Sequence, residues 1–133
     1  FLYRGVFKYM WKTWKNLKKI YPNFFMTRNA LIGLSVNWSK YSTPQKTLDY
    51  LNSNLNECGI VEINMGEFRD EINKNNFPLS INHDPVRVAK GKIPINRAHS
   101  LIKGFNPKNT TKIRLKMSKI ANWALNMCPI VED

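Results

Sequence analysis

Proline positions set the strongest limit on how this chain can fold, because proline ends or kinks a helix. Pro22 and Pro44 leave two uninterrupted segments in the first third of the sequence. Four further prolines are crowded between residues 78 and 107. The sequence therefore predicts helices in the region before residue 76 and a broken, irregular stretch after it.

Residues 1–21 have the apolar spacing of an amphipathic helix. At 100° per residue, five cations fall within about 80° of one another and form a basic ridge. The ridge consists of Arg4, Lys8, Lys12, Lys15 and Lys19. The opposite face is apolar and includes Leu2, Tyr3, Val6, Tyr9, Met10, Trp14, Leu17, Ile20 and Tyr21. The ridge fits an acidic helix on a partner, although a merely solvated face is the simpler interpretation.

Further helices are expected along the chain. One runs over residues 23–38, and a leucine-rich one runs from 44 to 57, with Thr43 as N-cap and Pro44 in the first helical position. A weaker segment covers 61–72, and a last helix covers 111–128. Residues 78–109 are expected to form an extended arm lying on another subunit. The fold class is therefore all-α, with a helical domain over 1–76 and an arm with a C-terminal helix over 77–133.

Charge is strongly segregated along the sequence. The formal net charge is +12, and residues 1–48 and 85–131 contain no carboxylate, whereas 49–84 is acidic. Two basic blocks favour a large anionic partner such as RNA, a cardiolipin-rich membrane or an acidic protein. A lysine- and asparagine-rich proteome would explain the number of lysines but not their alignment.

Several kinds of chemistry are not indicated. Cys58 and Cys128 form no metal-ligand motif and are interpreted as reduced thiols. His83-Asp84 and His99-Ser100 suggest catalysis, but the sequence supplies no evident third member. No apolar run is long enough to span a membrane. The tryptophans are interpreted as core or interface anchors. The sequence therefore predicts a protein that is not an enzyme and has no cofactor or metal of its own.

Leu2-Tyr3-Arg4 opens the first segment, and Lys8 follows four residues after Arg4. A second segment containing Arg28, the connection Ser42-Thr43-Pro44-Gln45-Lys46 and a leucine-rich third segment follow in order. As an ordered set over residues 1–60, these features resemble the LYR-motif family of mitochondrial proteins. Ser42-Thr43 lacks the acid that the family usually has before the proline, and Gly5 is a poor helix former.

The resemblance implies an antiparallel three-helix bundle on the matrix side of the inner mitochondrial membrane. It also implies docking of the acyl carrier protein, whose acyl-phosphopantetheine chain would lie among the helices near Leu2, Tyr3 and Val6. The partner-binding residues would be Leu2, Tyr3, Arg4 and Lys8, and the ridge extends this set to Lys12, Lys15 and Lys19. In this interpretation the chain is a non-catalytic adaptor.

The parent assembly is less closely defined. Gly59-Ile60-Val61-Glu62-Ile63 is similar to a stretch of the smaller matrix-arm LYR accessory subunit of respiratory complex I. Two alternatives stay open: an RNA-contacting or carrier-docking protein of the mitochondrial ribosome, and an assembly factor for iron–sulfur or respiratory complexes. The acid-free N-terminal segment also looks like a presequence, but its motif and aromatic residues favour a mature helix.

Overall fold

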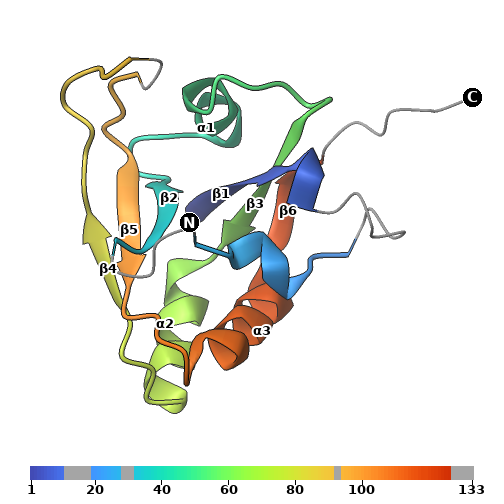
Figure 1. Cartoon of the computed structure of the whole chain (residues 1–133), viewed down its shortest axis with the longest axis vertical. Helices are drawn as coiled ribbons and strands as arrows, with labels where there is room; N and C mark the ends of the chain where they lie inside the picture. Colours follow the sequence, from blue (N-terminus) through green and yellow to red (C-terminus); the bar gives the residue numbers. More distant parts are fainter. Residues whose placement is uncertain (11–18, 28–31, 92–93, 127–133) are drawn as a thin grey trace, which may run out of the picture.

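A computed structural model describes residues 1–10, 19–27, 32–91 and 94–126. Its centre is an antiparallel sheet of six strands (Figure 1). In their order across the sheet, the strands are β4 (Ser80–His83), β5 (His99–Lys103), β2 (Leu34–Trp38), β1 (Leu2–Phe7), β3 (Cys58–Ile63) and β6 (Asn122–Leu125). The helical elements are η1 (Lys8–Met10), η2 (Pro22–Phe25), α1 (Pro44–Tyr50), α2 (Met65–Lys74) and α3 (Thr110–Ile120). Among the described residues, no helix is both long and apolar enough to cross a membrane.

The all-α prediction and its three-helix bundle are wrong, because the chain is a mixed α/β protein. The segment that the prediction treated as the first helix begins with β1, a central strand paired with both β2 and β3. Leu2 and Val6 pack on one face of the sheet and Tyr3 on the other. A strand that buries both faces shows little period-two alternation, so its apolar residues also fit a helical period.

Three other expected helical or irregular segments are also corrected. The helix over 23–38 is replaced by η2 and by β2, and β2 begins directly after Gly33, which has a left-handed backbone conformation (φ 111°). The arm over 78–109 contains β4 and β5, which pair with each other inside the sheet. The helix expected to reach residue 128 ends at Ile120, and β6 follows it. The secondary structure of these segments depends on pairing with strands that are distant in sequence. Local periodicity carries no information about such partners.

The start of α1 matches the sequence prediction, and the start of α2, which the sequence did not single out, has the same kind of cap. Thr43 caps α1, because its hydroxyl accepts a hydrogen bond from the backbone N–H of Lys46 at 3.1 Å, and Pro44 occupies the first turn. Asn64 caps α2 in the same way through the backbone N–H of Glu67. Both caps satisfy donors that the first helical turn leaves without intrahelical partners. α1 is nevertheless shorter than expected and ends at Tyr50 rather than near residue 57.

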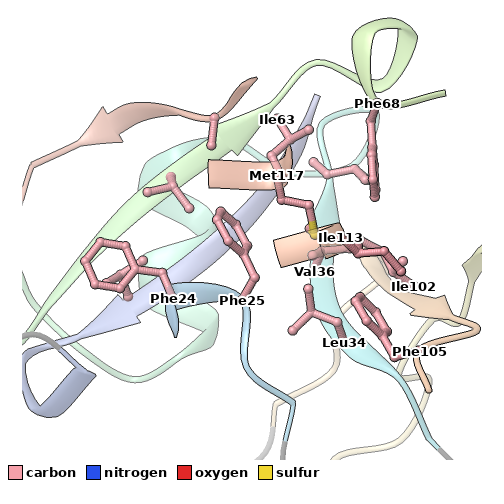
Figure 2. Packing of buried hydrophobic residues seen from close by; sticks show 14 of the residues in the cluster. Phe24, Phe25, Leu34, Val36, Ile63, Phe68, Ile102, Phe105, Ile113 and Met117 are labelled. Carbon is pink, nitrogen blue, oxygen red and sulfur yellow. The ribbon is translucent and has the colours of Figure 1, made fainter. Parts of the chain in front are cut away.

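The main core lies between one face of the sheet and the layer formed by η2, α2 and α3 (Figure 2). Phe24 and Phe25 of η2 are fully buried, as are Ile113 and Met117 of α3. Truncation of a buried phenylalanine to alanine typically costs about 3–5 kcal/mol. The short η2 turn therefore fills the space between the sheet and α3 and contributes to the packing of α3 on the strands.

α1 covers the opposite face only in part. A smaller apolar cluster forms there from Tyr3, Leu48, Cys58 and Ile60. The main contacts of α1 are with β1, β3 and β6, which are neighbours at the β6 end of the strand order. Over β2 and β5 the same face carries polar side chains, including the exposed Ser35.

Gly104 allows β5 to turn towards α3. Its φ is +109°, and an added Cβ would overlap the carbonyl oxygen of Pro78. Gly91 also has a positive φ, of +58°, but has open space around its Cβ position. We expect Gly104→Ala to destabilise the fold by several kcal/mol more than Gly91→Ala, since only Gly104→Ala adds a backbone clash to the conformational strain. Urea denaturation of both variants measures the difference, and equal midpoints would contradict the structural assignment.

Candidate functional site

The described residues that the sequence singled out for partner binding lie in β1, in η1 and just before η2. Leu2, Tyr3 and Val6 lie in β1 and are buried. Lys8 lies in η1 and lines a shallow pocket with Phe7, Tyr9 and Glu57. Lys19 lies in the lead-in to η2 and is exposed. Lys12 and Lys15 fall outside the described residues, as do Trp11, Trp14, Arg28 and Cys128.

Arg4 is bound by its own chain. Its Nη1 donates to the Ser35 carbonyl at 2.9 Å and its Nη2 to the Met26 carbonyl at 2.9 Å. Its Nε donates to the Phe24 carbonyl over a longer distance of 3.4 Å. Burial lowers the pKa of Arg4 to about 10, so the guanidinium remains charged at neutral pH. The planar guanidinium donates in several directions and so links β1 to both η2 and β2. The compact ammonium of a lysine does not reproduce this geometry.

Replacement of Arg4 tests this bracing role. Arg4→Met preserves the aliphatic stem but leaves the three carbonyls without their donor. We expect a loss of about 1–2 kcal/mol in the free energy of unfolding, because three charge-assisted hydrogen bonds are lost, of which only the one to Phe24 is partly buried. The matched control is Arg69→Met in α2, where the arginine is exposed and the change should stay within about 0.5 kcal/mol. Similar denaturation midpoints for the two variants would count against a structural role for Arg4.

A groove of about 480 Å³ runs between the lead-in to η2, α3 and the start of β6. This volume lies within the range of small-ligand sites. Two cations, two aromatic rings and several small or polar side chains line it. The lining residues are Lys19, Ile20, Tyr21, Pro22, Leu115, Ser118, Lys119, Ala121, Asn122 and Trp123. None of these residues carries a negative charge.

The rings of this groove are fixed by the core below them. Trp123 packs at 6.0 Å from the ring of Phe24, and Tyr21 makes an edge contact with the same phenylalanine at 5.7 Å. The Nζ of Lys19 lies 5.2 Å from the centre of the Tyr21 ring, within cation–π range. The two rings therefore form a wall of the groove whose position is set by Phe24, and the Lys19 ammonium lies over the Tyr21 ring.

α3 extends the positive charge away from the groove. Lys112 and Lys119 are exposed and lie seven residues apart, so they share one side of the helix. Arg114 has a buried Nε without a hydrogen-bond partner, and burial lowers the pKa of this guanidinium. The groove lies at the C-terminal end of α3, where the helix dipole contributes roughly half a negative charge. Lys19 and Lys119 together outweigh that contribution.

The sequence pattern singled out one cation of this groove, Lys19, but not the other. It placed Lys19 on a ridge of the first helix, whereas the structure brings Lys19 beside α3. Lys119 was noted only as part of the acid-free block at 85–131. The absence of acids together with the spacing of Lys112 and Lys119 was the available signal. The proximity of residue 19 to residue 119 had no local signature.

A second group of aromatic side chains lies at the end of β2. Trp38 makes edge contacts with Tyr41 and His83, while Tyr41 and His83 stack at 5.3 Å. The Nζ of Lys40 lies 5.3 Å from the centre of the Trp38 ring and 5.4 Å from that of Tyr41. These rings contact one another and the Lys40 ammonium, and Asp84 directly follows His83, so this group lacks the acid-free lining of the groove. In the described part of the chain, no cluster of three or more histidine, cysteine or carboxylate side chains could hold a metal.

Cys58 is a buried thiol rather than a reactive one. Its Sγ donates to the Gly59 carbonyl at 3.2 Å, and burial raises the pKa of the thiol to about 11. Because the folded-state pKa exceeds the unfolded one, this contribution to stability is present below about pH 9 and is lost as pH rises towards 11.

The pH dependence of stability provides the test for Cys58. We expect the wild-type free energy of unfolding to fall by about 1 kcal/mol more than that of Cys58→Ala between pH 8 and pH 10. Urea titrations at the two pH values measure this difference. Parallel losses in both proteins would show that the thiol does not carry the effect.

Comparisons of the chain with protein-family models, curated proteins and solved structures find no match. The LYR resemblance and its mitochondrial location therefore remain predictions. The geometry of the groove and its charge are the basis for a functional proposal.

Proposed function

We propose that this protein binds single-stranded RNA, with the groove between η2 and α3 as the principal contact. The observation that carries the proposal is the joint presence of Lys19, Lys119, Tyr21 and Trp123 in one groove without a carboxylate. Sequence-tolerant binders of single strands combine cations that follow the phosphates with rings on which bases stack. The net charge of +12 supports attraction to a polyanion over longer distances.

The rings and the lysines have different roles in this binding mode. Stacking of a base on an aromatic side chain is worth about 1–3 kcal/mol, whereas an exposed ion pair contributes about 0–1 kcal/mol. Affinity would therefore come mainly from the wall formed by Tyr21 and Trp123. Lys19 and Lys119 would position the phosphates and make binding sensitive to salt. Ser118 and Asn122 add hydrogen-bonding groups that can meet a ribose hydroxyl.

Carrier docking is supported less directly. Its acyl chain would have to enter a three-helix bundle, and residues 1–10 form β1 and η1 instead of the first of those helices. Arg4 is also committed to backbone carbonyls of its own chain. RNA contact does not require that bundle. It is therefore the alternative that agrees with both the charge pattern and the groove.

A charge-reversal pair tests the proposal. We expect Lys19→Glu/Lys119→Glu to weaken binding of a fluorescent single-stranded RNA by at least about tenfold at 0.1 M salt. The slope of log affinity against log salt should become shallower by about 1–2, because two phosphate contacts are lost. Fluorescence anisotropy over a salt series measures both quantities, and a DNA strand of the same sequence tests the contribution of the ribose hydroxyl.

The matched control is Lys46→Glu/Lys74→Glu, which changes the net charge equally at exposed positions on α1 and α2. If this control weakens binding as much as the groove variant does, the interaction is a diffuse effect of net charge. Acyl carrier protein in place of RNA forms a separate arm of the assay. Tight carrier binding without RNA binding would reject the proposal and favour the adaptor interpretation.

A further inference from the structure

On the α1 face of the sheet, three side chains from different segments form a continuous polar chain. His99 of β5 lies between Ser35 of β2 and Asp84, which directly follows β4. The His99 Nε2 is 3.3 Å from the Ser35 Oγ. Its Nδ1 is 2.8 Å from the Asp84 main-chain carbonyl and 3.4 Å from the Asp84 carboxylate Oδ2. The arrangement is that of a nucleophile, a base and an orienting acid.

The hydrogen-bond partners determine which nitrogen of His99 acts as the base. A main-chain carbonyl can only accept, so the short contact with Asp84 requires a proton on Nδ1. In the neutral imidazole, Nε2 is then the unprotonated nitrogen, and Ser35 donates its hydroxyl proton to it. The tautomer needed for general-base activation of the serine follows from the Asp84 backbone as well as from its carboxylate.

The backbone around Ser35 is held in place. The Arg4 guanidinium donates to the Ser35 carbonyl at 2.9 Å, and Ser35 pairs with Leu101 in the β2–β5 ladder. The hydroxyl nevertheless remains reachable, because Ser35 is exposed and α1 covers this face mainly over β1, β3 and β6 rather than over β2 and β5. A fixed backbone with an accessible Oγ suits a nucleophile better than it suits a packing residue.

Asn37 is a buried polar neighbour of the Ser35–His99 pair on the same face of the sheet. It lies directly opposite His99 in the ladder and two residues beyond Ser35. Its Oδ1 accepts from the Asn96 amide at 2.9 Å, so its Nδ2 is turned away from Asn96. Asn37 is buried, and this hydrogen bond ties β2 to the segment that precedes β5.

We propose that Ser35 is a nucleophile activated by His99 and that it accepts the acyl group of short carboxylic esters. The Ser35 Oγ attacks the ester carbonyl while its proton passes to the His99 Nε2. The C–O bond to the alcohol then breaks, and the alkoxide takes the proton from His99. Water, deprotonated by the same nitrogen, then attacks the acyl carbonyl. The bond between this carbon and the Ser35 Oγ breaks, the Oγ takes the proton back from His99, and the carboxylic acid leaves. The polar surroundings of Ser35 favour a short acyl group over a long apolar one.

A fluorophosphonate probe tests the nucleophile directly. Attack by the Ser35 Oγ forms a P–O bond and expels fluoride, so intact mass spectrometry and peptide mapping locate the adduct. We expect one adduct on Ser35 of the full chain, none on Ser35→Ala, and labelling slowed about 100-fold in His99→Gln. Asp84→Asn keeps the backbone acceptor and should slow labelling by a smaller factor. Hydrolysis of p-nitrophenyl acetate above the Ser35→Ala background measures turnover.

Ser80→Ala is the matched control, because Ser80 is an exposed serine of β4 on the same face of the sheet. It should label and turn over as the wild type does. Circular dichroism and thermal melts confirm that His99→Gln and Ser35→Ala are folded. Two results would overturn the proposal: a folded wild type without an adduct on Ser35, or equal labelling rates in wild type and His99→Gln. The second result would show that His99 only links the strands.

Discussion

The contact between the Arg4 guanidinium and three backbone carbonyls is the interaction on which the surrounding structure depends. It joins β1 to β2 through Ser35 and to the η2 turn through Phe24 and Met26. η2 carries the phenylalanines that fill the space between the sheet and α3. Without this brace of hydrogen bonds, apolar packing would have to hold the η2 turn against the sheet. Hydrogen bonds from a charged group to particular carbonyls also require one defined geometry, whereas apolar neighbours can repack in several ways.

The same brace connects the two proposed sites on opposite faces of the sheet. On one face, the position of Phe24 fixes Tyr21 and Trp123, which form the wall of the basic groove. On the other face, the Arg4 contact with the Ser35 carbonyl holds the backbone that presents the hydroxyl to His99. The two proposals rest on different residues and different chemistry. A defect in the brace would nevertheless disturb both of them.

Electrostatics distinguishes the two faces. The groove gathers lysines without carboxylates, which suits recognition of a polyanion. The polar chain at His99 instead contains Asp84 and amide groups, which suit proton transfer more than phosphate binding. The acidic central block of the sequence contributes most of its carboxylates to α1, α2 and β3, away from the lining of the groove. The lining of the groove thus contains no carboxylate, although Glu71 of α2 pairs with Lys116 of α3 at 3.9 Å.

Local signals of the sequence determined a limited set of features. Thr43 with Pro44 fixed the start of α1, because capping and the missing proline N–H act within one turn. The acid-free blocks indicated an anionic partner, since charge adds up regardless of fold. His83-Asp84 and His99 were visible as chemistry-bearing residues, but the sequence offered no third member.

Only the tertiary structure decided the rest. Leu2-Tyr3-Arg4 became a strand because β2 and β3 pair with it on both sides, and a strand buried on both faces has no distinctive local period. Lys19 and Lys119 line the same groove although they are far apart in the chain. Ser35 and His99 are also distant in sequence and lie within 3.3 Å of each other. Such contacts depend on the register of the sheet and the packing of α3, which are global properties. Single-segment patterns therefore identified the types of residue available, whereas the fold chose which of them act together.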